Sequence, residues 1–180
     1  RNLTQLPDGS DRPLSDIDKL VPDHEILCGG FPCQPFSKSG AQQGLKDKVR
    51  GTLFFDIMQI IRAKSPKYVV LENVRNLAGP KHKDTWRTII ESLWFEGYAI
   101  NKEPLVMSPH KLPPELGGAP QVRERVFIIA TRLNLKQKLL FQNNRYNIEP
   151  VLQHSDLPEW NPDHWSVSDI LEPEENISNI

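Results

Sequence analysis

The sequence predicts an α/β fold built on a mixed sheet. Two short apolar runs, at residues 25–29 and 68–71, flank a stretch at 53–61 whose apolar residues recur at helical spacing. Strand, helix and strand in this order form a right-handed crossover, so the two strands are expected to be parallel. A further strand at 126–131 follows a proline-rich segment with no helical period, and it is expected to run antiparallel to its predecessor.

The first strand is expected to end in a loop, because Gly29-Gly30 and the turn-rich residues 31–35 follow it. The helix after it has Thr52 as a candidate N-cap, and Ser65-Pro66 closes its pattern. The first 24 residues hold no convincing strand. The core is therefore expected to be an α/β sheet.

A second helix is indicated by Asp84 as its cap and Gly97 at its C-terminal end. One face of this helix is apolar, and its two tryptophans are expected in the core: Trp86, Ile89, Ile90, Leu93 and Trp94. A strand is predicted over residues 98–106.

Length and composition indicate one globular domain or a large piece of one. The chain has 180 residues, of which 38% are hydrophobic and 25% charged. It shows no long apolar run and no secretory leader, so we expect neither a membrane span nor export, and a cytoplasmic location. Cys28 and Cys33 are too few for a disulfide framework or a zinc site, so no metal is expected and at least one thiol is free.

Charge is unevenly distributed along the chain, although the net charge is −1. Residues 38–87 carry eleven Lys and Arg against four Asp and Glu, whereas 149–180 carry eight acidic residues and no Lys or Arg. The basic stretch, with its glycines, is either a phosphate-contacting loop or a solvated face. We expect a folded domain over 1–133 and an irregular acidic extension over 134–180.

Several residues whose side chains can take part in a reaction are expected at one edge of the predicted sheet. Ligands of open parallel sheets bind at the carboxyl ends of the strands, which is where Cys33 and Glu72 follow. The antiparallel last strand starts at this same edge and brings Arg123 and Arg125 there. A thiol, a carboxylate and two guanidinium groups together indicate a nucleophilic site for an anionic substrate.

Each of these residues also has a structural explanation. Cys33 fits an inert packed thiol, and Glu72 fits a residue that caps the next turn through Asn73. Arg123 and Arg125 fit an ordinary surface charge cluster. Taken singly, the structural explanation is favoured, but the combination favours a nucleophilic site.

Four segments resemble the DNA (cytosine-5) methyltransferases of bacterial restriction-modification systems. They are GFPCQPFS at 30–37, RGTLFFD at 50–56, ENV at 72–74 and QVRER at 121–125, with a fainter likeness in SDILE at 168–172. They occur in the family's order and at about its spacing. The resemblance implies a Rossmann-like class I methyltransferase fold, present here as a partial mixed sheet with an antiparallel last strand.

The resemblance also implies roles for the four catalytic candidates. Cys33 would attack carbon 6 of cytosine, which lets carbon 5 take the methyl group of S-adenosylmethionine. Glu72 would bond the ring N3 and the exocyclic amine, and Arg125 the O2. Arg123 would support Cys33 or a phosphate.

Binding residues are implied for DNA and for the cofactor. The base must be flipped out of the duplex, under a loop at 34–52 in which Ser37 and Lys38 meet phosphate and Ser39 approaches the vacated space. The family's cofactor contacts match Asp16 as the acid near the adenine amino group, with apolar or backbone contacts from Ile17, Pro32 and Leu53. For Asp16, capping of a short helix is an equal alternative.

The sequence departs from the family at three places. It lacks the Phe-x-Gly-x-Gly loop of the donor site, it reaches only the lead-in to the DNA-recognition domain, and residues 108–120 are longer than usual. We therefore expect the catalytic middle of such an enzyme, with weak activity alone, completed by the missing segments in cis or as a second chain. The alternatives are a non-catalytic, DNA-associating or structural remnant, and an RNA-acting relative.

Overall fold

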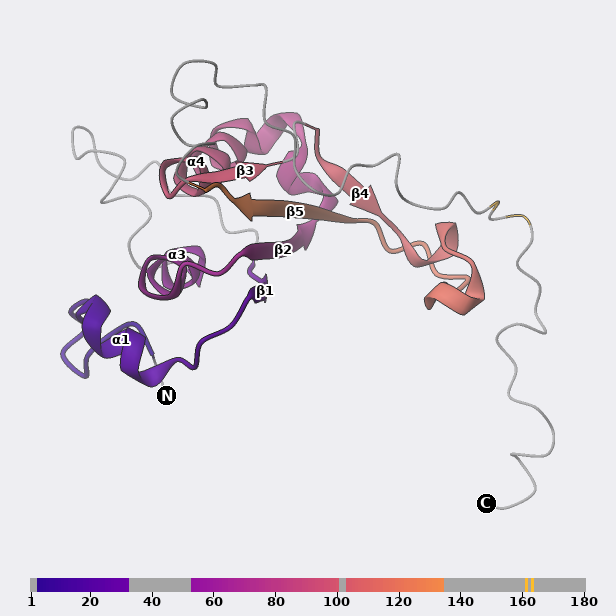
Figure 1. Cartoon of the computed structure of the whole chain (residues 1–180). Helices are drawn as coiled ribbons and strands as arrows, with labels where there is room; N and C mark the ends of the chain where they lie inside the picture. The colour runs from indigo at the N-terminus through magenta and orange to yellow at the C-terminus, as the bar shows by residue number, and fades with distance from the viewer. Residues whose placement is uncertain (1–2, 33–52, 101–102, 135–160, 162, 164–180) are drawn as a thin grey trace, which may run out of the picture.

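The computed structural model describes residues 3–32, 53–100, 103–134, 161 and 163 (Figure 1). Within these residues, five strands form one sheet in the order β1-β2-β5-β3, with β4 also paired to β5. The strands are β1 (Ile26–Gly30), β2 (Tyr68–Val74), β3 (Tyr98–Ile100), β4 (Leu105–Met107) and β5 (Arg125–Arg132). The α/β class and the mixed sheet predicted from the sequence are confirmed.

The β1–α3–β2 unit has the predicted crossover. β1 and β2 are parallel, with Gly30 opposite Glu72 at their carboxyl ends. The helix between them, α3 (Leu53–Lys64), ends where Ser65 adopts a left-handed φ of 46°. Thr52, its predicted N-cap, lies outside the described residues.

β5 is antiparallel to all of its partners, as predicted for the last strand. It pairs with β2 along seven residues, from Tyr68 opposite Thr131 to Val74 opposite Arg125. The prediction of one continuous strand at 98–106 is wrong: β3 pairs with the end of β5 and β4 with its start. Pro104 directly precedes β4 and has no amide hydrogen to donate, which interrupts the ladder there.

The second predicted helix is α4 (Lys83–Phe95). Gly97 closes it with a φ of 85°, and its amide donates to the carbonyl of Trp94 at 2.9 Å. Asp84 as the cap is wrong, because the cap position is His82 and Asp84 lies inside the first turn. Two 3-10 turns, η1 (Arg75–Ala78) and η2 (Pro80–His82), lead directly into the helix and start it earlier than the sequence suggested.

The core lies on one face of the sheet, against α3 and α4. Alternate residues of β2 and β5 are buried there, as the two-residue period of a strand requires. Their partners are apolar side chains of both helices, among them Met58, Ile61, Ile89 and Leu93. Trp86 is half-buried against this core, and Trp94 is half-buried against a separate small cluster of Ala99 and Leu133, so their expected core position is only partly met.

A short helix, α1 (Leu14–Leu20), packs against α3 through the fully buried Ile17. The segment before it contains an isolated bridge between Gln5 and Asp11 and, as expected, no strand within the residues described. In the described part of the chain, every helix is too short or too polar for a bilayer crossing. This part also contains no cluster of three potential metal ligands.

Candidate active site

An ion pair joins the carboxyl end of β2 to the start of β5. The Nε of Arg125 lies 2.6 Å from Oε1 of Glu72. The two residues are diagonal neighbours, because Glu72 is opposite Phe127 and Val74 is opposite Arg125. The side chain of Glu72 is 39% exposed and that of Arg125 is 22% exposed, so this pair lies at an accessible edge of the sheet.

Gly30 makes room for the carboxylate of Glu72. It is the last residue of β1 and lies opposite Glu72 in the parallel ladder. A Cβ added at this position would lie 3.2 Å from Oε2 of Glu72, closer than most real contacts. A side chain at position 30 would therefore push against the acid.

Asn73 ties the chain that leads to Cys33 to the end of β2. Its side-chain amide donates to the carbonyl of Phe31 at 2.8 Å, and its Oδ1 accepts from the amide of Val74 at 2.8 Å. The ring of Phe31 packs on Phe54 of α3 with a centroid distance of 5.5 Å. Among the residues that the structure describes, no side chain caps the turn that follows β2, whose cap position is Val74, so the alternative of Glu72 as a capping residue is wrong.

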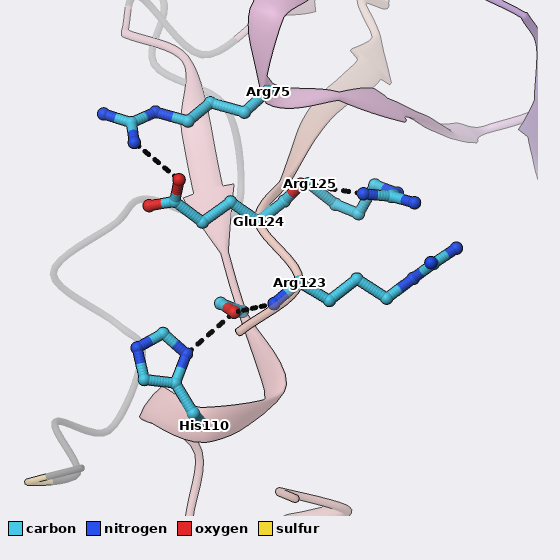
Figure 2. Close-up of polar contacts among 6 residues, drawn as sticks. Arg75, His110, Arg123, Glu124 and Arg125 are labelled. Carbon is cyan, nitrogen blue, oxygen red and sulfur yellow. Dashed lines mark hydrogen bonds and ion pairs between the residues drawn. The ribbon is translucent and has the colours of Figure 1, made fainter. Parts of the chain in front are cut away.

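Successive side chains of the segment 123–125 point in opposite directions, as in an extended chain. Figure 2 shows the side chains of Arg123 and Arg125 extending to one side, and Glu124 to the other, where it meets Arg75 of η1. The Nη1 of Arg75 lies 2.5 Å from Oε2 of Glu124. Arg125 also donates from Nη1 to the carbonyl of Glu124 at 3.0 Å. The two arginines thus face the same way, one of them already paired with the acid.

Only part of the predicted site falls on described residues. Glu72 and Arg125 come together as expected, and Arg123 is exposed and extends to the same side as Arg125. The remaining predicted catalytic and DNA-binding residues lie outside the described part of the chain: Cys33, Ser37, Lys38 and Ser39. The other cysteine, Cys28, is a free and exposed thiol.

The predicted cofactor residues differ in accessibility. Asp16 is half-exposed in the first turn of α1, and Pro32 is exposed. Leu53 is 55% exposed at the start of α3, whereas the side chain of Ile17 is fully buried. Ile17 can therefore offer only its backbone. The alternative of Asp16 as a cap is wrong, because the cap position is Pro13 and no side chain bonds there.

Three further residues shape this site without having been singled out for it. Gly30 is the first residue of one matched motif and Arg75 directly follows another, and their contacts follow from the register of the strands. Ser108 accepts a hydrogen bond from the amide of Arg123 at 2.9 Å. Its place directly after a strand, fifteen residues before Arg123, was the only signal in the sequence.

Comparison with known proteins identifies relatives of this chain. The C-5 cytosine-specific DNA methylase family matches residues 5–179. The type II methyltransferase M.AluI of Cellulosimicrobium cellulans is 59% identical over 107 residues, which are 59% of this chain and 20% of that protein. M.HhaI of Haemophilus parahaemolyticus is 40% identical over 134 residues, 74% of this chain and 38% of that protein.

Among solved structures, a DNMT2 mutant from Spodoptera frugiperda aligns with a TM-score of 0.49 at 24% identity, over 75% of this chain and 35% of that one. The chain spans well under half the length of each of these relatives. The family match extends over nearly the whole chain and includes Glu72 and Arg125. The chain therefore belongs to the C-5 cytosine-specific DNA methylase family.

Proposed function

We propose that this chain carries the catalytic segment of a DNA (cytosine-5) methyltransferase, as part of a restriction-modification system in the cytoplasm. The observation that carries the proposal is the Glu72–Arg125 pair, at 2.6 Å, beside the glycine that ends β1. An acid and a guanidinium at the carboxyl edge of a sheet suit a pyrimidine ring, which offers donor and acceptor atoms in one plane.

Cys33 is the proposed nucleophile. An ordinary thiol has a pKa of about 8.5 and is only a few per cent ionised at neutral pH, so neighbouring positive charge is needed to favour the thiolate. Arg123 and Arg125 are the proposed sources of that charge. The thiolate forms a bond to carbon 6 of cytosine, and the displaced electron pair makes carbon 5 nucleophilic. Support comes from Asn73, which holds the main chain of Phe31, two residues before Cys33.

Glu72 and Arg125 are proposed to bind the ring while its charge changes. Glu72 is half-exposed and has one oxygen on Arg125, so its carboxylate is oriented before a base arrives. It would hold the exocyclic amine and N3, and Arg125 would hold O2. Carbon 5 takes a methyl group, which S-adenosylmethionine supplies when bound. Loss of the carbon-5 proton and release of the thiol then restore the double bond.

The accessible residues suit part of a methyl-donor site. Asp16 offers an acceptor for an amino group, and Pro32 and Leu53 offer exposed apolar surface. Ile17 would contribute only backbone. The rest is proposed to come from segments outside this chain, in cis or as a second chain. Among the described residues β1 pairs only with β2, and Ile26 on it is 56% exposed, so its outer edge can accept further strands.

Double-stranded DNA is the proposed substrate, with the target cytosine flipped out because a stacked base cannot be attacked. Ser37 and Lys38 are proposed to contact phosphate, and Ser39 to approach the space that the base leaves. These proposals rest on the family pattern.

Covalent trapping tests the reaction. DNA containing 5-fluorocytosine blocks the loss of the carbon-5 substituent, so the chain supplemented with the family's flanking segments should form an adduct that survives denaturing electrophoresis. Cys33→Ser should abolish this adduct, and the matched change Cys28→Ser should leave it intact. An adduct in Cys33→Ser would remove that thiol from the mechanism. The chain alone should bind S-adenosylmethionine weakly, and tight binding in calorimetry would contradict the need for further segments.

A further inference from the structure

The hydrogen-bond ladder between β4 and β5 ends at the active site. Its last pair is Met107 opposite Arg125, and the residue after β4 is Ser108. Beyond this pair a side chain takes over, because the amide of Arg123 donates to the hydroxyl oxygen of Ser108 at 2.9 Å. The side chain of Ser108 thus extends the β4–β5 ladder by one hydrogen bond, to Arg123. This bond lies two residues before Arg125, which pairs with Glu72.

The hydroxyl of Ser108 is held in place. Ser108 is only 2% exposed, and its oxygen also lies 2.8 Å from Nδ1 of His110. A hydroxyl has one hydrogen and two lone pairs, so it can accept from Arg123 and still bond the imidazole in either tautomer. The hydroxyl thus joins the ring of His110 to the main chain of Arg123.

The intervening residues, 109–119, which we call the lobe, close on themselves. The amide of Ala119 donates to the carbonyl of Pro109 at 3.1 Å, across the base of the lobe. The amide of Gly118 donates to the carbonyl of Pro113 at 3.1 Å. A Cβ at Gly118 would lie 1.9 Å from the carbonyl oxygen of Leu112, so only glycine fits this turn. The lobe therefore returns the chain to Ser108 in a defined geometry.

We propose that Ser108, oriented by His110, is a positioning residue for the arginines of the active site. Arg123 and Arg125 are two residues apart and extend to the same side. A main-chain anchor at Arg123 restricts the first residues of β5 and so restricts the place of the Arg125 guanidinium against Glu72. This role rests on the proposed function for its catalytic meaning, while the anchoring itself can be measured without activity.

Amide exchange by NMR on the whole chain tests the anchor. Ser108→Ala should speed exchange of the Arg123 amide about five- to tenfold, as expected for the loss of one hydrogen bond. The Nε–H signal of Arg125 should also become more mobile. Ser108→Thr keeps the hydroxyl and should restore both signals. Ser92→Ala is the matched control, because Ser92 also bonds a backbone group, the carbonyl of Thr88 at 2.7 Å, but within α4.

The role of His110 is tested by replacing it with Asn and with Gln, whose side-chain amides lie at different distances from the main chain. Asn places its polar group near the position of the imidazole Nδ1, so His110→Asn should preserve slow exchange at Arg123. Gln reaches further, to about the position of Nε2, so His110→Gln should not. Equal exchange in these two variants would remove the orienting role of His110.

The outcomes separate the anchor from the chemistry. Unchanged exchange at Arg123 in Ser108→Ala overturns the proposal, and so does faster exchange with an unmoved Arg125 signal. Melting curves close to that of the parent chain confirm that the variants are folded. In the supplemented chain, Ser108→Ala should slow adduct formation at saturating DNA several-fold without weakening DNA binding. Absence of any adduct in the parent would refute the proposed function and leave the exchange result to decide the anchor.

Discussion

The two ends of the β2–β5 pair use similar polar groups in different ways. At the end near Tyr68, the hydroxyl of Tyr98 donates to the carbonyl of Pro66 at 2.7 Å, and Tyr98 is 1% exposed. The guanidinium of Arg132 donates to the carbonyl of Ser65 beside it. These groups bond main-chain atoms of the turn between α3 and β2, so this end is an anchor.

At the other end, Glu72 and Arg125 bond each other and remain half-exposed. Among the described residues the carboxylate keeps one oxygen for another partner, and Arg125 bonds only the carbonyl of its neighbour Glu124 besides. The main-chain contacts between separate segments come from Asn73 and Ser108. The comparison teaches that the choice of partner, rather than residue type or exposure, distinguishes the proposed active edge from the structural end.

The sharpest test of this difference is Glu72→Gln. The change removes the negative charge at the active edge, and adduct formation with 5-fluorocytosine DNA should fall about 10²- to 10⁴-fold, the usual contribution of a positioned acid or base. Glu96→Gln is the matched control, because Glu96 pairs with Arg62 at 2.7 Å in a similarly exposed ion pair away from the site. Equal losses in both variants would contradict the special role of the edge at Glu72.

Tyr98→Phe tests the anchoring end. The carbonyl of Pro66 would lose its partner, so the free energy of unfolding should fall by about 1–3 kcal/mol in urea titrations. Adduct formation by the folded variant should stay unchanged. Tyr68→Phe, on a half-exposed tyrosine, should cost less. A loss of adduct without a loss of stability in Tyr98→Phe would reverse the assignment of the two ends.

The same tyrosine predicts an alkaline loss of stability. Burial raises the pKa of Tyr98 to about 12 from an ordinary value of 10.0, so the folded state holds this proton more tightly than the unfolded state. The resulting stability is present below about pH 10 and is lost as the pH rises through about 12. The free energy of unfolding should therefore fall by roughly 2–3 kcal/mol between pH 9 and pH 12. This part of the fall should be absent in Tyr98→Phe.

Gly30→Ala should give a smaller effect at the active edge. The new methyl group would displace the Glu72 carboxylate by a few tenths of an ångström, and adduct formation should slow roughly three- to tenfold. Gly29→Ala is its control, because a Cβ there lies 3.2 Å from the Cδ1 of Ile57, the far end of a flexible side chain. A slowing in Gly29→Ala as large as that in Gly30→Ala would argue against a specific contact with Glu72.

Arg75→Gln should have the smallest effect. Arg75 is 60% exposed and pairs with Glu124 on the side away from Arg125. Exposed ion pairs contribute less than about 1 kcal/mol and are screened by salt. The difference in melting temperature from the parent should therefore be small and should vanish at 1 M salt. A large loss of adduct in this variant would place Arg75 in the active edge.

The sequence predicted the directions of the strands around the site but neither their order in the sheet nor the contacts between their side chains. The placing of Glu72 and Arg125 at one edge followed from two features: a crossover helix before β2, which makes β1 and β2 parallel, and no crossover helix before β5, which makes β5 antiparallel. Their direct bond did not follow, because it depends on the diagonal register of β2 and β5. The break before β4 and the early start of α4 were missed because a single proline and two 3-10 turns override the hydrophobic pattern.

The closed lobe has a practical consequence. Its base is joined between Pro109 and Ala119, before the chain reaches Arg123, so its tip is structurally separate from the proposed active site. Leu116 at that tip is 57% exposed. A fluorophore, an affinity tag or a short loop from another protein could be grafted at this tip, to report on the protein or immobilise it without altering the edge at Glu72 and Arg125.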